Sequence, residues 1–277
     1  ATPAVFLVAN TLGTFALFLP ISIIAPARAL FFSYGFPPSI WGWVVLTGLF
    51  QALYYLGLAG AYRTGDLSLA YPLLRAVPVV LVLFANLLLG RSEQISMLAV
   101  WGMIFVAVGA LLLPLQHFKD WNWRRWFIPA VGWALFAAVN TVGYSLVDDY
   151  ALRILRISSG SALGVTLVYA FWEGLAASFW LCLLILRLEK DRARLAESLC
   201  TGLPQAALTG LGIYLAYTLV LIAMGYVQNV SYVVAFRQTS ILFGALLGLL
   251  VLKEPHYPPR IVGVGVLFMG LVMVGLG

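Results

Sequence analysis

The stretch SIWGWVVLTGLFQALYYLGLAGAY, residues 39–62, decides the fold class of this chain. It contains no charged residue and is longer than the roughly 20 apolar residues that a helix needs to cross a membrane. The whole composition agrees, because 63% of the 277 residues are hydrophobic and 9% are charged, whereas about a quarter of the residues of soluble domains are charged. The sequence therefore predicts an all-α polytopic membrane protein.

Pro, Gly and charged residues divide the chain into a series of such apolar stretches. They are residues 4–24, 39–62, 67–89, 97–115, 126–146, 162–186, 203–227, 231–252 and 260–276. The polar segments between them, such as PARALFFSYGFPP (26–38) and DDYALRILRISSG (148–160), are interpreted as connections. All of these connections are short, so none is predicted to hold a soluble domain.

The tetrapeptide LTGL occurs twice, at residues 46–49 and 208–211, an offset of 162 residues. Arg75 and Arg237 keep the same offset, and Gly102 with Gly109 precede Gly263 with Gly270 by 161. Landmarks in three successive apolar stretches therefore share almost one register. This indicates a duplicated architecture with a first repeat at 1–116 and a second at 117–277, in which the Thr and Gly of LTGL serve close helix packing.

The second repeat opens with the stretch at residue 126, and the first repeat has no counterpart of that stretch. We therefore expect ten helices in the intact protein, of which this chain shows nine. An odd number of spans in each repeat places the two repeats in opposite orientations, as in many secondary transporters.

Three runs resemble the EamA-type branch of the drug/metabolite transporter superfamily. They are AYRTGDLSLAYPLLRAVPVVL (61–81), YSLVDDYALR (144–153) and VVAFRQTSILFGALLGLLVLKEP (233–255), and the similarity extends over essentially the whole chain. The resemblance implies ten helices in two inverted five-helix repeats around a central cavity. It also implies transport of small metabolites by alternating access.

Three charged side chains fall well inside the predicted spans: Arg75, Glu173 and Arg237. Each would cost about 2.5–3.5 kcal/mol at the centre of an unpaired membrane helix. One interpretation is that the arginines hold an anionic group of a substrate, which a guanidinium grips bidentately, while Glu173 couples transport to protons. The other is that Glu173 forms an internal ion pair with an arginine and fixes helix packing.

Aromatic and amide side chains accumulate on the same stretches and are candidates for the wall of a substrate cavity, since small-ligand sites combine apolar walls with a few polar groups. Besides Arg75 and Arg237, the predicted cavity residues are Gln51, Tyr54, Tyr55, Tyr71, Asn140, Tyr144, Tyr169, Trp172, Tyr214, Tyr217 and Gln238. Pro72 and Pro78 flank Arg75, and each removes a backbone donor. They predict either a helix break that marks the substrate site or a simple structural kink.

Enzyme signatures are missing from the sequence: no Walker A motif, no HExxH, no dinucleotide loop and no nucleophile elbow. We predict no enzymatic activity, cofactor or metal site. The net charge of +6 comes mostly from basic residues at the ends of apolar stretches, so nucleic acid is not an expected partner. The expected partners are the lipid bilayer and a small-molecule substrate. The seven-spaced glycines could pack against a neighbouring helix of the chain, a second protomer or another membrane subunit.

The sequence thus predicts a multi-pass secondary transporter of the cytoplasmic (inner) membrane, which exports an amino acid-like metabolite or another organic anion. The alternative is a non-transporting scaffold or assembly subunit that keeps the transporter fold. Two orientations stay open. The distribution of Lys and Arg over the connections places the C-terminus outside, whereas the family resemblance implies that both termini are inside.

Overall fold

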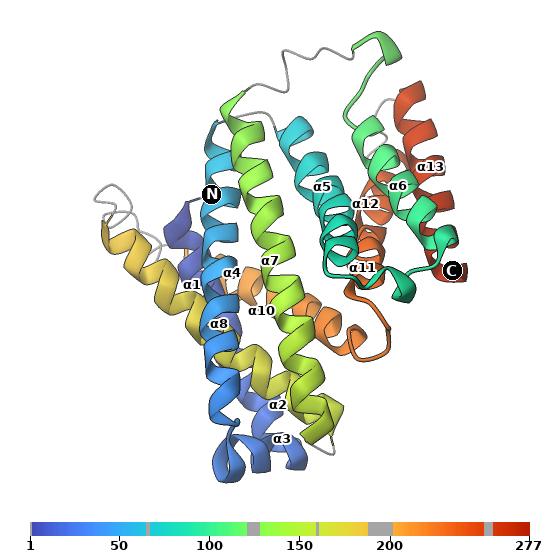
Figure 1. Ribbon diagram of the computed structural model, residues 1–277. Helices are drawn as coiled ribbons and strands as arrows, with labels where there is room; N and C mark the ends of the chain where they lie inside the picture. Colours follow the sequence, from blue (N-terminus) through green and yellow to red (C-terminus); the bar gives the residue numbers. More distant parts are fainter. Residues whose placement is uncertain (1, 65–66, 121–127, 159–160, 188–201, 252–256) are drawn as a thin grey trace. The chain divides into compact units, whose positions relative to one another are not determined.

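The computed structural model describes residues 2–64, 67–120, 128–158, 161–187, 202–251 and 257–277, and these residues form helices without any strand (Figure 1). The helices are α1 (Pro3–Ala16), α2 (Phe18–Ile23), α3 (Ala25–Ala29), the π-helical η1 (Leu30–Tyr34), α4 (Pro38–Thr64), α5 (Leu67–Leu88), the short η2 (Ser92–Gln94), α6 (Met97–Leu112), the short η3 (Phe118–Asp120), α7 (Pro129–Ser158), α8 (Ala162–Arg187), α10 (Leu203–Ala223), α11 (Val230–Phe236), α12 (Thr239–Leu250) and α13 (Pro258–Leu276). Each predicted apolar stretch coincides with one helix or with two consecutive helices.

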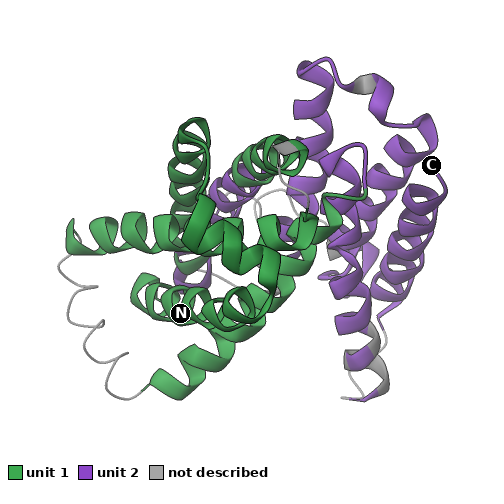
Figure 2. Ribbon diagram, turned by 90° about the horizontal axis from the view of Figure 1, so that it is seen from below, with its two compact units in different colours: residues 1–59, 143–226 green, residues 60–142, 227–277 purple. Residues whose placement is uncertain are grey.

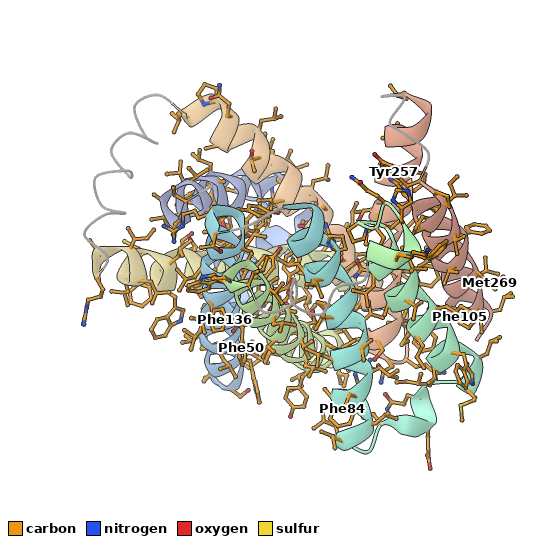
Figure 3. All side chains as sticks on the ribbon, turned by 90° about the horizontal axis from the view of Figure 1, so that it is seen from above. Phe50, Phe84, Phe105, Phe136, Tyr257 and Met269 are labelled. Carbon is orange, nitrogen blue, oxygen red and sulfur yellow. The ribbon has the colours of Figure 1, made fainter. Side chains whose placement is uncertain are left out.

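Six helical segments of the described part are long and apolar enough to cross a membrane. They are Pro3–Ile23, Pro38–Thr64, Pro129–Ile157, Ala162–Arg187, Leu203–Ala223 and Pro258–Leu276. The outer faces of the helices carry large apolar side chains, for example Phe84, which is 57% exposed, and Met269, which is 55% exposed (Figure 3). Apolar side chains that face lipid need no cover, so the prediction of an all-α polytopic membrane protein is confirmed.

Helix ends follow local sequence signals. Proline is the first residue of α4, α7 and α13, where its missing amide hydrogen would have no helical partner. The side chain of Ser96 accepts a hydrogen bond from the Ala99 amide (3.0 Å) and caps α6. After η1 and α5 the chain turns through Gly35 (φ 67°) and Gly90 (φ 71°), a conformation that glycine adopts without a steric cost.

The interpretation of DDYALRILRISSG as a connection is wrong for most of its length, because α7 continues to Ser158. Asp149 forms an ion pair with Arg153 one helical turn later (Oδ2 to Nε, 2.9 Å), which supports the helix. Arg156 donates hydrogen bonds from Nη2 to the carbonyl oxygen of Leu221 (2.7 Å) and to Thr166 Oγ1 (3.2 Å). These contacts hold the polar end of α7 against α10 and α8. In the same way, part of the first connection, residues 26–38, is helical in α3 and η1.

The expected helix break at Pro72 and Pro78 is also wrong, since α5 runs through both prolines. Each proline removes one amide donor, and membrane helices tolerate such a loss. A break occurs instead at Arg237 and Gln238, between α11 and α12. There the Thr239 hydroxyl donates to the Phe236 carbonyl (2.6 Å) and the Ser240 hydroxyl to the Arg237 carbonyl (3.0 Å), so side chains compete with the backbone for the helical carbonyl groups.

The chain divides into two compact units (Figure 2). Unit 1 contains residues 1–59 and 143–226, and unit 2 contains residues 60–142 and 227–277. Each unit therefore combines segments from both of the repeats predicted at 1–116 and 117–277. The boundary between the two repeats in the sequence does not coincide with the boundary between the two compact units.

Helices of unit 1 approach each other closely at glycines. A Cβ atom at Gly210 would clash with the carbonyl oxygen of Ala9, and one at Gly13 with the carbonyl oxygen of Gly210, so α1 and α10 meet backbone to backbone. A Cβ atom at Gly48 would lie 2.5 Å from the Cβ atom of Ala176 on α8. Gly48 and Gly210 are the glycines of the two LTGL copies, and their predicted role in close packing is confirmed.

In unit 2, α6 packs along α13 through the seven-spaced glycines. A Cβ atom at Gly102 would lie 2.7 Å from the carbonyl oxygen of Gly270, and one at Gly109 would lie 2.7 Å from that of Gly263. These glycines therefore pack against a neighbouring helix of the same chain, which is one of the three partners predicted for them.

This contact yields a prediction for stability. Replacing Gly270 by leucine should lower the free energy of unfolding by about 3 kcal/mol or more, because the new side chain meets backbone atoms that cannot move aside. A Cβ atom at Gly265, on the same helix, meets no atom within 4 Å. Thermal unfolding of the purified variants should therefore show a large loss for Gly270→Leu and little change for Gly265→Leu. Equal losses would contradict the packing role.

Candidate functional site

A buried carboxyl group, that of Asp148 on α7, receives hydrogen bonds from three other helices of unit 1. Thr47 Oγ1 on α4 donates to Asp148 Oδ1 (2.6 Å), and the Tyr169 hydroxyl on α8 donates to the same oxygen (2.8 Å). The Tyr217 hydroxyl on α10 donates to Asp148 Oδ2. Asp148 has no exposed surface. A carboxylate only accepts hydrogen bonds, so three hydroxyl donors suit its ionised form.

A second carboxyl group, Glu173, lies one turn after Tyr169 on α8. It is also 0% exposed, and neither of its oxygens has a hydrogen-bond partner within the described part of the chain. The Asp148 and Glu173 carboxyl groups are close enough to interact electrostatically. The interior of unit 1 therefore contains two neighbouring acidic side chains, of which one is hydrogen-bonded and the other is not.

Tyrosine rings continue this polar interior. Tyr54 lies edge-on to Tyr144 (centroids 5.8 Å apart), and Tyr144 lies edge-on to Tyr217 (5.8 Å). Tyr54 also contacts Tyr55 (5.4 Å), which stacks on Phe6 of α1. The rings thus connect α4, α7 and α10 around the carboxyl groups.

A hydrogen-bonded network joins α1 to α8 and α10 beside this region. Asn10 Nδ2 donates to the Gly174 carbonyl oxygen (2.9 Å) and to Ser178 Oγ (2.9 Å), and the Tyr214 hydroxyl donates to Asn10 Oδ1 (3.0 Å). A Cβ atom at Gly174 would clash with the Tyr214 hydroxyl and with Thr14 Oγ1. Gly174 therefore allows Tyr214 to reach the network next to Glu173.

Polar residues of four helices meet at Asp148 in unit 1. Thr47, Asp148, Tyr169 and Tyr217 meet in one layer, which we call the Asp148 layer. Gln51, Tyr144, Glu173 and Tyr214 lie three or four positions from these residues on the same four helices. Residues three or four positions apart share a helix face, and one turn advances about 5.4 Å.

Three contacts relate α4 to α8, and one of them places Gly48 against Ala176. Trp41 contacts Trp172 (5.0 Å), and Trp180 Nε1 donates to the Val45 carbonyl oxygen (3.0 Å), so α4 and α8 run in the same direction. Gln51 and Glu173 follow Thr47 and Tyr169 by one turn each. The Tyr214 hydroxyl lies beside Gly174, the residue that follows Glu173.

Most of the predicted cavity residues on unit 1 either donate a hydrogen bond to Asp148 or lie on the same helix faces as its donors. Trp172 is an exception. Its ring stacks on Phe31 of η1 (5.6 Å) and lies edge-on to Trp41 (5.0 Å). It belongs to an aromatic cluster at one end of α4 and α8, away from the Glu173 face of the helix.

The other predicted site residues belong to unit 2. Arg75 is half-buried on α5 and Arg237 is half-buried at the end of α11. Asn140 and Gln238 are buried, and their amide groups donate to backbone carbonyl oxygens four residues earlier, those of Phe136 (2.7 Å) and Val234 (2.9 Å). The side chain of Tyr71 lies outside the described part of the structure.

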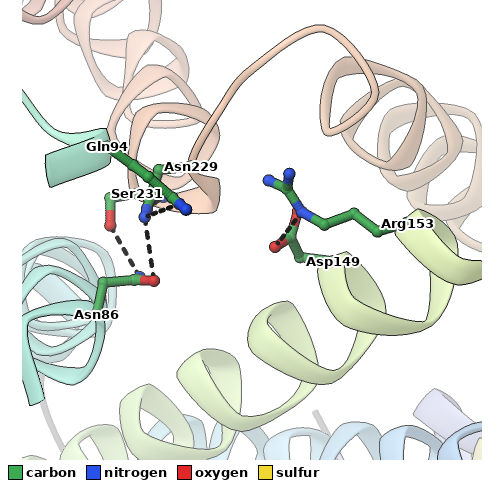
Figure 4. A network of polar contacts seen from close by, with 6 residues as sticks. All are labelled: Asn86, Gln94, Asp149, Arg153, Asn229 and Ser231. Atoms are coloured by element: carbon green, nitrogen blue, oxygen red, sulfur yellow. Dashed lines mark hydrogen bonds and ion pairs between the residues drawn. The ribbon is translucent and has the colours of Figure 1, made fainter. Parts of the chain in front are cut away.

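Unit 2 has its own amide network, drawn in Figure 4. Asn229 Nδ2 donates to Asn86 Oδ1 (3.1 Å) and to Gln94 Oε1 (3.3 Å), while Asn86 Nδ2 donates to Ser231 Oγ (3.1 Å). Asn229 also caps α11, since its Oδ1 accepts from the Ser231 amide (2.9 Å). These donors and acceptors satisfy one another, which indicates a structural connection between α5, η2 and α11.

Sequence reasoning missed Asp148, Thr47 and Asn10. The spacing of four between Tyr144 and Asp148, between Thr47 and Gln51, and between Tyr169 and Glu173 was a signal that these polar residues share helix faces. Asn10 stands alone on an apolar helix and gave no such signal.

Comparison with known proteins informs the fold alone. No protein family and no curated protein matches the sequence. A protein of known crystal structure superposes on 100% of this chain and 88% of its own, with a TM-score of 0.66 and 16% sequence identity. At this identity the likeness supports the fold and says nothing of the activity.

Proposed function

We propose that this protein is a secondary transporter of the cytoplasmic membrane, similar to the EamA-type drug/metabolite transporters, that moves a small polar metabolite by alternating access coupled to protons. The observation that carries the proposal is the pair of fully buried carboxyl groups, Asp148 and Glu173, inside membrane-spanning helices. Ionisable groups at such depth are costly and mark substrate or ion pathways.

Glu173 is the proposed proton-coupling residue. A buried carboxylate with no counter-charge or hydrogen bond costs several kcal/mol, so Glu173 is neutralised by a proton or by a bound group. The groups around it are Asp148, Tyr169, Tyr214, Tyr217 and Tyr55.

The close helix contacts support the inverted repeat that such a transporter would have. Gly102 meets Gly270 and Gly109 meets Gly263, so α6 and α13 run antiparallel. At the offset of 161, Gly102 corresponds to Gly263 and Gly109 corresponds to Gly270. Replacing each glycine of the first contact by its counterpart in the other repeat therefore gives the second contact. A two-fold axis in the membrane plane would produce this relation.

Unit 1 supplies a second example. Gly48 meets Ala176 on α8, and Gly210 meets Gly13 on α1. The two LTGL glycines are 162 residues apart, and Gly13 and Ala176 are 163 apart. The two contacts are therefore equivalent under the same duplication. Arg75 and Arg237, also equivalent, are the proposed side chains for an anionic group of the substrate.

Transport into proteoliposomes under an imposed pH gradient tests the proposal. A panel of amino acids and organic acids should include a compound that accumulates only with the gradient, and Glu173→Gln should abolish that response because its amide does not titrate. Glu93→Gln removes a carboxyl group at an exposed position of η2 and should leave the response intact.

Gradient-driven transport that persists in Glu173→Gln would refute the coupling role. A wild-type protein that transports no compound of the panel, and that co-purifies with another membrane protein in fixed ratio, would favour the scaffold alternative.

A further inference from the structure

One segment of unit 1, residues 25–34 of α3 and η1, is attached to α8 through apolar contacts. Its hydrogen bonds run within the segment and to the residues that flank it, for example from Gly35 N to the Leu30 carbonyl oxygen (2.8 Å). Among the described residues, none joins it to α4 or α8. Its polar side chains are exposed, and a charged one among them places the segment at an end of the membrane span; they are Arg28, Ser33 and Tyr34. The segment can therefore leave α8 without orphaning a buried polar group.

Both ends of the segment have the backbone geometry of a hinge. At Ile24 the chain leaves α2 in an extended conformation (φ −79°, ψ 108°) before α3 begins. At Gly35 it turns through a positive φ (67°), and a Cβ atom there would meet no atom within 4 Å. Hinges are a few element-terminal residues that absorb changes of φ and ψ, and they are often small. Rotation at these two residues would move residues 25–34 while α2 and α4 stay in place.

Aromatic rings and close backbone packing hold the segment against α8. Phe31 of η1 stacks on Trp172 (centroids 5.6 Å apart) and lies edge-on to Phe171 (5.2 Å). The backbone of α3 covers the first turn of α8, because a Cβ atom at Gly164 would lie 3.0 Å from Ala27 N. Ala27 has no exposed surface. Phe31 and Ala27 thus form the face of the segment that contacts α8.

The same rings lead from the segment to the Asp148 layer. Phe36, the residue after the second hinge, contacts Tyr169 (6.5 Å), whose hydroxyl donates to Asp148 (2.8 Å). Phe36 also contacts Trp41 (6.0 Å), and Trp41 lies edge-on to Trp172 (5.0 Å). A movement at the hinge would therefore change the packing on a tyrosine that binds the buried carboxyl group.

We propose that residues 25–34 form a lid at the Asp148 end of unit 1. The lid swings away at Ile24 and Gly35 to admit solute, and it closes when Phe31 packs on α8, as in the structure. The inference rests on the proposed function, because alternating access requires an element that opens one end of the interior. Elements that move in this way are drawn from the weakly attached parts of a protein, which describes this segment.

A reversible cross-link tests whether the lid must move. In a background of Cys182→Ser and Cys200→Ser, the pair Ala27→Cys and Gly164→Cys should form a disulfide under oxidant. The two positions are adjacent, and a disulfide joins Cβ atoms about 3.5–4.5 Å apart. The oxidised protein should lose gradient-driven transport in proteoliposomes and regain it on reduction. Each single-cysteine variant should transport equally with and without oxidant.

Labelling of Ala27→Cys by a water-soluble maleimide measures lid opening without any substrate. Phe31→Ala removes the ring contacts with α8 and should accelerate the labelling at least about tenfold, since aromatic pairs add to the stabilisation from burial. Tyr34→Ala removes an exposed ring of the same helix and should leave the rate unchanged. Ala177→Cys, buried on α8 away from the lid, should stay unlabelled in Phe31→Ala, which distinguishes opening from unfolding.

Full transport by the disulfide-linked protein, or an unchanged labelling rate in Phe31→Ala, would overturn the lid. Each experiment decides alone if a variant of the other does not give a monodisperse protein or a cross-link. If neither the wild type nor the reduced double variant transports any compound while Phe31→Ala accelerates labelling, the proposed function fails and the movable lid is supported. Gradient-driven transport without faster labelling would refute only the lid.

Discussion

Gly210→Leu is expected to prevent the stable folding of unit 1. The Cβ atom alone would overlap the carbonyl oxygen of Ala9 and approach the amide of Gly13, so a leucine must separate α1 from α10. Overpacking of a rigid contact costs about 3 kcal/mol or more. The separation would also pull Asn10 away from Tyr214, which breaks a hydrogen bond between the same two helices. The measurement is the yield and the thermal unfolding midpoint of the purified variant.

Gly212→Leu is the matched control, because a Cβ atom at Gly212 on the same helix meets no atom within 4 Å. It should express and unfold like the wild type. A folded Gly210→Leu protein with an unchanged midpoint would show that α1 and α10 do not pack as described.

The fold class was predictable because apolar length is a local property. Each membrane helix can be recognised from its own 20 or so apolar residues. The two copies of LTGL likewise predicted two places of close helix packing. Which helix each glycine meets was not predictable. Gly48 and Gly210 occur in the same tetrapeptide, yet their partners are Ala176 and Gly13, and that choice is made by the arrangement of whole helices.

The candidate site was predictable only in part, for a similar reason. Glu173 stood out because apolar residues surround it in the sequence, and it is buried as expected. Asp148 was assigned to a connection because Asp149, Arg153 and Arg156 follow it and lower the hydropathy of the region. In the structure those charges are held by an ion pair within α7 and by hydrogen bonds to α8 and α10, so the helix continues past them.

Thr47 shows that a repeated sequence motif does not determine what its residues contact. Both LTGL threonines were assigned to packing, but Thr47 donates to Asp148, whereas Thr209 donates to the Gln205 carbonyl oxygen of its own helix (2.7 Å). Identical local sequence thus gives a site residue in one copy and none in the other. The difference arises because only Thr47 faces a carboxyl group, and no pattern within either stretch contains that information.

The loss of the Asp148 carboxyl group should affect both stability and transport. Asp148→Ala leaves the hydroxyl groups of Thr47, Tyr169 and Tyr217 without their acceptor, and each buried donor left unsatisfied costs about 1–3 kcal/mol. We expect a total loss of about 3 kcal/mol or more, measured by thermal unfolding, together with loss of transport in proteoliposomes.

A double-mutant cycle distinguishes this network from a simple cavity effect. Thr47→Val removes one donor with little change in shape, so Thr47→Val should destabilise the wild type but have a smaller effect in the Asp148→Ala background, where its partner is already gone. Residues in one hydrogen-bond network show coupling of about 0.5–3 kcal/mol. Additive effects would mean that Thr47 and Asp148 act independently. Coupling would instead establish that the Asp148 layer holds α4 to α7 through the hydrogen bond between Thr47 and the Asp148 carboxyl group.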